Sequence, residues 1–107
     1  SSMLNAYKER RDLGISLLNE VPHVKVFKPK GAFYLWVDFS YYLGKKIGNN
    51  VIKDDIDLAT LMLKEAHVAS VPGTPFGAKG FLRFSIASSL TDIKKALVRI
   101  KDWLSLV

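Results

Sequence analysis

The sequence predicts an α+β fold, in which a small, mainly antiparallel sheet has helices packed on one of its faces. Three observations support this: apolar residues repeat with a helical period at both ends of the chain, central segments alternate with a period of two, and a turn-rich loop leads into one of these alternating segments. The expected order is helix, strand, strand, helix, strand, strand, helix. The 107 residues are 49 % apolar and 11 % aromatic, which suits one folded domain.

The first helix is expected over residues 3–21, with Pro22 ending it. Its apolar stripe is broad and includes Arg11 and Gly14. Because glycine costs about 1 kcal/mol relative to alanine inside a helix, these two residues suggest a contact with something beyond a simple core. The alternative is an ordinary amphipathic helix, in which the stem of Arg11 packs against the protein and its head reaches water.

Two strands are expected next, an edge strand over residues 24–27 and a second strand over residues 33–39, joined by a tight turn at 28–31. One face of the second strand is wholly apolar, whereas the other carries Tyr34 and Trp36. These two aromatic residues could stack on a cofactor or line a pocket. The packing role is favoured, and that surface is expected to meet protein outside this chain or a second subunit.

Residues 40–53 predict a surface excursion with at most one turn of helix. Asp54 or Asp55 then caps a largely buried helix, and these acids are interpreted as helix-start residues rather than metal ligands. The two histidines, His23 and His67, are interpreted as structural or surface groups. The expected apolar ridges of this helix are formed by Ile56, Ala59 and Leu63 and by Leu58, Leu61, Met62 and Ala66.

The loop at residues 69–81 is rich in proline and glycine, which exclude regular helix and fix a shaped turn after a short strand between Val68 and Val71. A strand begins at Leu82, and alternation places Arg83 on the face away from the core, with Ser85 and Ala87. A guanidinium in such a place suits a carboxylate, because its planar fork offers two parallel donors. The commoner role of such an arginine is to pair with a neighbouring acid or to lie along the surface.

The last helix is the clearest amphipathic segment of the chain, and Thr91 and Asp92 are expected to cap it. Its apolar stripe is formed by Ile93, Ala96, Leu97, Ile100, Trp103 and Leu104.

Three motifs carry a family resemblance. Residues 71–77 (VPGTPFG) followed by 80–87 (GFLRFSIA) resemble the C-terminal segment of class I aminotransferases, which are fold-type-I enzymes that use pyridoxal phosphate. Residues 31–39 (GAFYLWVDF) look like the glycine-led aromatic strand of that family, and residues 7–12 (YKERRD) are similar to the helix that connects its two domains. The motifs occur in the family's order, and the aspartate-aminotransferase-like members are the most similar.

The resemblance implies that residues 1–107 are a single C-terminal small domain, that residues 1–21 are the interdomain helix, and that the cofactor-binding large domain lies outside this chain. It implies that Arg83 binds the α-carboxylate of the amino-acid or 2-oxo-acid substrate. Pyridoxal phosphate would be held by the large domain, because none of the twelve lysines here has the serine- and glycine-rich context of the imine-forming lysine. No catalytic, cofactor-binding or metal-binding residue is therefore expected, and the segment alone should be inactive. The expected partners are the enzyme's own large domain and a second subunit of a cytoplasmic homodimer.

Two other functions remain open: a free-standing module that binds a small ligand or RNA, and the small domain of another fold-type-I enzyme, such as a lyase or a synthase. The net charge of +6 raises nucleic acid as a partner, but the basic residues are spread along the chain, so binding to nucleic acid is not expected. The chain has no cysteine and no apolar run of about 20 residues, so neither a disulfide framework nor a membrane span is expected.

Overall fold

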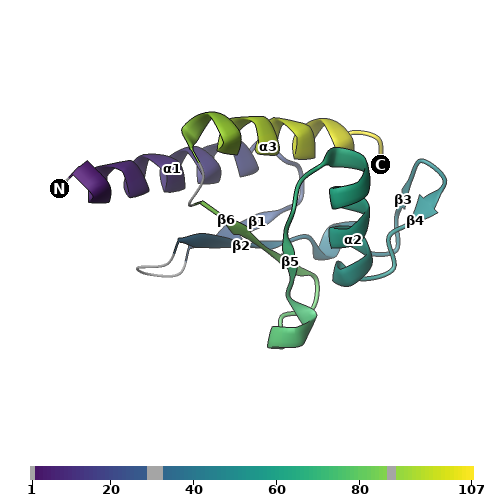
Figure 1. Ribbon diagram of the computed structural model, residues 1–107. Coiled ribbons are helices and arrows are strands. Elements are labelled where there is room, and N and C mark those ends of the chain that lie inside the picture. The colour runs from purple at the N-terminus through teal and green to yellow at the C-terminus, as the bar shows by residue number, and fades with distance from the viewer. Residues whose placement is uncertain (1, 29–32, 87–88) are drawn as a thin grey trace.

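The computed structural model describes residues 2–28, 33–86 and 89–107 of the chain. A four-stranded sheet has the order β1 (Lys25–Phe27), β2 (Tyr34–Asp38), β6 (Phe81–Ser85) and β5 (Val71–Pro72), and each neighbouring pair is antiparallel. Two long helices, α1 (Ser2–Leu18) and α3 (Leu90–Leu104), lie side by side over one face of this sheet, and α2 (Asp55–Leu61) stands beside β5 (Figure 1). The predicted fold class is confirmed.

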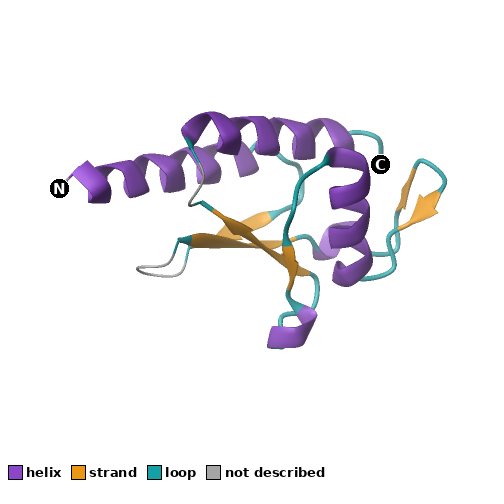
Figure 2. Ribbon diagram, in the orientation of Figure 1, coloured by secondary structure: helices purple, strands orange, loops and turns teal. Residues whose placement is uncertain are grey.

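The other face of the sheet is open in the part of the chain that the structure describes. Figure 2 shows α1 and α3 on one side of the strands and the short 3-10 turn at Thr74–Phe76 on the opposite side. No described helix is long and apolar enough to cross a membrane. Most of the tight turn predicted at 28–31, the start of the motif at 31–39 and the predicted outward position of Ala87 lie outside the described residues.

Helix α1 ends at Leu18, so the predicted end at residue 21 is wrong by three residues. After Leu18 the chain tightens into i to i−3 hydrogen bonds, in which the N–H groups of Glu20 and Val21 donate to the carbonyl groups three residues earlier at 3.1 and 3.0 Å. Gly14 is buried inside the domain, since a Cβ at this position would lie 3.1 Å from Cδ1 of Leu35. The glycine therefore serves contact with the chain's own sheet and requires no outside partner.

Residues 40–53 are more ordered and more deeply packed than predicted. A 3-10 turn at Ser40–Tyr42 is followed by the two-stranded hairpin of β3 (Lys46–Ile47) and β4 (Asn50–Val51). Tyr42, Ile47 and Ile52 are buried, so the prediction of a mere surface excursion is wrong for these side chains. The Tyr42 hydroxyl donates to the carbonyl of Pro22 at 2.6 Å, and burial, with a smaller contribution from neighbouring Tyr41, raises its pKa.

Asp54 is the residue that caps α2, because its Oδ1 accepts a hydrogen bond of 2.7 Å from the N–H of Asp57. The helix continues into a π-helical turn at Met62–Ala66, and His67 ends it in the left-handed conformation. Both histidines are exposed residues in left-handed turns, in agreement with the structural interpretation.

The predicted apolar ridge that includes Ile56 and Leu63 is wrong, because these two side chains are 48 % and 55 % exposed. The helix buries a single face, formed by Leu58, Ala59, Met62 and Ala66. The π-helical turn contributes to the difference, since it advances the chain by more than 3.6 residues per turn and moves Leu63 off the buried face.

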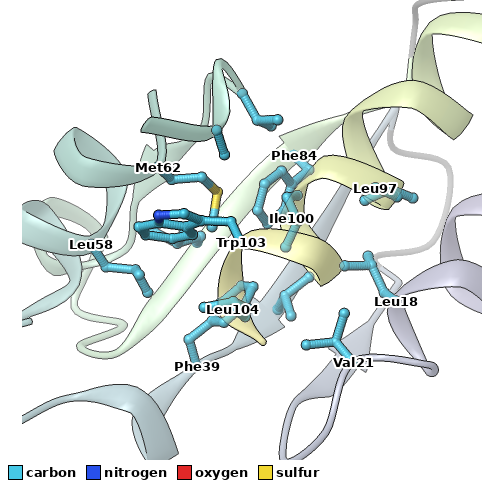
Figure 3. Close-up of a cluster of buried hydrophobic side chains, with 14 of the residues drawn as sticks. Leu18, Val21, Phe39, Leu58, Met62, Phe84, Leu97, Ile100, Trp103 and Leu104 are labelled. Carbon is cyan, nitrogen blue, oxygen red and sulfur yellow. The ribbon is translucent and has the colours of Figure 1, made fainter. Parts of the chain in front are cut away.

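Ser89, rather than Thr91 or Asp92, caps α3, and its Oγ accepts a hydrogen bond of 3.2 Å from the N–H of Asp92. The predicted apolar stripe of α3 is confirmed, and its buried side chains meet those of α1, α2 and the sheet in one core (Figure 3). The labelled members of that core are Leu18, Val21, Phe39, Leu58, Met62, Phe84, Leu97, Ile100, Trp103 and Leu104.

Candidate functional site

Arg83 lies at the centre of the open face of the sheet. Its strand alternates as predicted, because Leu82 and Phe84 are buried in the core whereas Arg83 is half-buried on the opposite face. The strand register places Arg83 directly opposite Trp36 of β2 and opposite Val71 of β5. Strands on both sides therefore fix the backbone from which this side chain projects.

Two aromatic rings flank the guanidinium of Arg83. Its Cζ lies 4.8 Å from the ring centre of Tyr34 and 5.5 Å from that of Phe76. The ring of Phe76 in turn meets that of Trp36 edge to face, with 5.8 Å between the centres. Cation–π contacts of this kind restrict the position of a guanidinium without neutralising its charge.

Arg83 has no ion pair among the residues that the structure describes. The two ion pairs found there are Arg11 with Asp12 at 3.3 Å and Lys101 with Glu20 at 3.0 Å. Over this part of the chain, the interpretation in which Arg83 pairs with a neighbouring acid is therefore not realised. The two rings that contact its guanidinium attract the positive charge but offer no carboxylate oxygen to its N–H donors.

A cavity of about 380 Å³ opens beside Arg83, a volume in the range of small-molecule sites. Arg83 is the only cation among the described residues that line it. The hydroxyl of Ser70 is buried and has no hydrogen-bond partner within the described residues. The described lining consists of Phe33, Tyr34, Ala69, Ser70, Val71, Arg83 and Ser85. A single unpaired guanidinium in a mainly apolar pocket is suited to one carboxylate of a small ligand.

The sequence allowed Tyr34 and Trp36 either to line a pocket or to pack against other protein groups, with packing favoured. In the structure the two residues differ in role. Tyr34 lines the cavity and contacts the guanidinium, whereas Trp36 packs against the rings of Phe76 and Phe81. A larger cavity of about 490 Å³ lies under α3, on the helix-covered side of the sheet, and Arg83 is not part of its described lining.

The loop before Arg83 is held by Asp55, whose role the sequence did not predict. Asp55 is completely buried, and its carboxylate accepts hydrogen bonds from the N–H and hydroxyl of Thr74 at 2.8 and 2.5 Å and from the N–H of Gly80 at 3.1 Å. Burial by itself raises the pKa of Asp55, but these hydrogen bonds outweigh burial and hold the pKa below its ordinary value. The loop also needs Gly73, because a Cβ there would overlap the carbonyl oxygen of Ala78.

The described residues of this cavity do not by themselves fit the pyridoxal phosphate that the family resemblance implies. Imine formation needs a lysine, and the phosphate needs several converging donors, whereas the described lining provides one arginine and no lysine. Nor do three His, Asp or Glu side chains of the described segments come together at a distance that could hold a metal ion. What these residues can do chemically is bind and orient a carboxylate.

The family described as aminotransferase class I and II has a sequence model that matches residues 1–100. A probable aspartate/prephenate aminotransferase of Aquifex aeolicus is 43 % identical over 101 residues, which cover 94 % of this chain and 24 % of that protein. A bifunctional aspartate aminotransferase and glutamate/aspartate-prephenate aminotransferase of Petunia hybrida is 38 % identical over 102 residues, which cover 94 % of this chain and 21 % of that protein. The chain thus spans about a quarter of the length of these relatives.

Solved structures give the same likeness. The aspartate aminotransferase of Rhizobium meliloti matches with a TM-score of 0.89 at 37 % identity, covering 94 % of this chain and 26 % of that chain. An aromatic aminotransferase of Pyrococcus horikoshii matches with a TM-score of 0.82 at 33 % identity, covering 99 % and 27 %.

Proposed function

The chain belongs to the class I and II aminotransferases, and we propose that it is the C-terminal small domain of a pyridoxal-phosphate-dependent, aspartate-aminotransferase-like enzyme. The family inferred from three sequence motifs is confirmed by the match over residues 1–100. The proposed reaction moves an amino group between an amino acid and a 2-oxo acid. Relatives named as aspartate and aspartate/prephenate aminotransferases favour aspartate as one of the amino acids.

In this proposal Arg83 binds the α-carboxylate of the substrate. The observation that carries it is a guanidinium beside a small cavity, flanked by Tyr34 and Phe76 and without an acid partner among the described residues. Two parallel N–H groups of the guanidinium donate to the two oxygens of the α-carboxylate. A carboxylate fixed at two points limits the directions in which the Cα–H bond can face, so the contribution of Arg83 is orientation rather than proton transfer.

The open face of the sheet is the proposed contact with the rest of the enzyme. Phe27 and Phe76 are 48 % and 58 % exposed on this face, and exposed apolar residues that gather on one face mark interaction surfaces. The relatives are about four times as long as this chain, and a large domain seated there would cover these rings and close the cavity over Arg83. In this arrangement residues 1–107 form one domain, residues 1–21 connect it to the large domain, and a second subunit completes the enzyme.

The test uses the full-length parent enzyme with aspartate and 2-oxoglutarate. Arg83→Ala is expected to raise KM and to lower kcat/KM. The expected loss of transition-state stabilisation, calculated from the ratio of the two kcat/KM values, is about 2 to 4 kcal/mol, the scale of a lost two-point contact to a charged group. Arg99→Ala is the matched control, because Arg99 is an exposed arginine of α3. A kcat/KM for Arg83→Ala close to that of the control would overturn the assignment.

Product analysis of the same enzyme separates the remaining alternatives within fold type I. Transfer yields one new amino acid for each 2-oxo acid consumed. A lyase or a synthase would instead release a product without using the 2-oxo acid, and that outcome would contradict the proposed reaction.

A further inference from the structure

Three hydrogen bonds from the loop at residues 73–80 converge on the carboxylate of Asp55. It lies in the first turn of α2, yet its side-chain hydrogen bonds cross 19 and 25 positions of sequence to Thr74 and Gly80. Two of its three donors are backbone N–H groups, so the carboxylate fixes the path of the main chain and not only of one side chain. Asp54, the adjacent acid, is the cap of α2, so capping leaves the carboxylate of Asp55 free for the loop.

The two points that Asp55 holds lead to the two sides of the guanidinium site. Thr74 begins the 3-10 turn that carries Phe76, whose ring lies 5.5 Å from Cζ of Arg83. Gly80 directly precedes β6, and Arg83 is the third residue of that strand. The loop is closed between these points by hydrogen bonds of 2.8 Å from Gly73 to Phe81 and 2.9 Å from Ala78 to Gly73. A displacement of the Asp55 contacts would therefore move both Arg83 and the ring against it.

We propose that Asp55 is a positioning residue for substrate binding, which acts through the loop at residues 73–80 to hold Arg83 and Phe76 in place for the carboxylate. This inference rests on the proposed function, since it takes Arg83 as the carboxylate-binding residue. Asp55 contacts no substrate in this role. An ionised carboxylate is required because it accepts three hydrogen bonds and donates none, whereas an amide would turn an NH₂ group toward the N–H donors of the loop.

The experiment compares variants of the full-length enzyme by calorimetric affinity for maleate, a dicarboxylate probe, and by KM and kcat for 2-oxoglutarate. Asp55→Asn is expected to weaken maleate binding and to raise KM by about 5- to 50-fold, with a smaller change in kcat, as for lost positioning of a binding group. Asp57→Asn is the matched control in the same helical turn, because among the described residues the Asp57 side chain accepts one hydrogen bond, from the N–H of Lys53 at 3.0 Å, and none from the loop. Affinity for maleate in Asp55→Asn equal to that of the control overturns the inference.

A second pair of variants removes one contact and leaves the acid in place. Thr74→Val deletes the hydroxyl that donates to Asp55, whereas Thr74→Ser keeps it. Weaker maleate binding by Thr74→Val, by about 3- to 10-fold, with recovery in Thr74→Ser supports the inference even if Asp55→Asn does not fold. Equal affinities for the two Thr74 variants overturn it.

Combination with Arg83→Lys separates a positioning role from general damage to the fold. If Asp55 acts through Arg83, adding Asp55→Asn to Arg83→Lys changes maleate affinity by less than about 2-fold, whereas independent effects would multiply. Multiplied effects therefore count against the inference. If Arg83→Ala itself leaves maleate affinity unchanged, the proposed function fails. If Arg83→Ala weakens binding and Asp55→Asn does not, only the role of Asp55 fails.

Discussion

The guanidinium of Arg83 lies over the ring of Tyr34, 4.8 Å from its centre, although the two residues are not direct partners in the sheet. In the β2–β6 register Arg83 faces Trp36, and Tyr34 faces Ser85, so the contact runs diagonally across the strands. Diagonal neighbours on one face of a sheet are within reach of long and aromatic side chains. The direction of Arg83 is therefore set by a neighbouring strand as well as by its own.

Replacement of Tyr34 by leucine is expected to weaken substrate binding and leave the charge of the site unchanged. Loss of a cation–π contact worth about 0.5 to 2 kcal/mol predicts a KM for 2-oxoglutarate that is about 2- to 30-fold higher in the full-length enzyme. Tyr34→Phe keeps the ring face and should retain most of the affinity. The two KM values decide the point: equal increases for Tyr34→Leu and Tyr34→Phe would assign the effect to the hydroxyl instead of the ring.

Acidification is expected to release the loop that Asp55 holds. Hydrogen bonds place the folded pKa of Asp55 below the unfolded value of about 3.9, so its contribution to stability is complete above that value and is lost as the pH falls through the folded pKa. Amide protection at Thr74 and Gly80, corrected for intrinsic exchange, should therefore decrease from pH about 5 to pH about 3 in the native enzyme. In the Asp55→Asn variant, amide protection at Thr74 and Gly80 should be low at every pH in this range. Equal protection in both proteins at pH about 6 would contradict the prediction.

Local periodicity was sufficient to predict the face on which Arg83 lies. A period of two needs only neighbouring residues, and Leu82, Phe84 and Ile86 are all buried as that pattern requires. The amphipathic stripe of α3 was predicted for the same reason. The capping residue of α3 was not predicted correctly, since Ser89 and Thr91 are both good capping residues and only the backbone conformation distinguishes them.

The contacts of Asp55 could not be predicted from local pattern, because they join residues 19 and 25 positions apart. Three acids at the start of α2 all suit a helix N-terminus, and only the folded loop shows which one turns inward. The hairpin of β3 and β4 was missed for a related reason. Each strand has two residues, too few for alternation to be detected, and nothing in the local pattern distinguishes buried Ile47 and Ile52 from exposed Val51.

Gly14→Ala is expected to destabilise the protein, although alanine is the better helix former. The added Cβ would lie 3.1 Å from Cδ1 of Leu35, which is itself buried, so the leucine must move into a filled core. Overpacking of this kind costs about 1 to 3 kcal/mol, against a gain of about 1 kcal/mol in helix propensity. Thermal unfolding should therefore show a Tm for Gly14→Ala below that of the native protein, and a still lower Tm for Gly14→Val. Ser16→Ala, at an exposed position of the same helix, provides the control for propensity alone. If Gly14→Ala and Ser16→Ala both had a Tm above that of the native protein, α1 would not pack closely against Leu35 of β2.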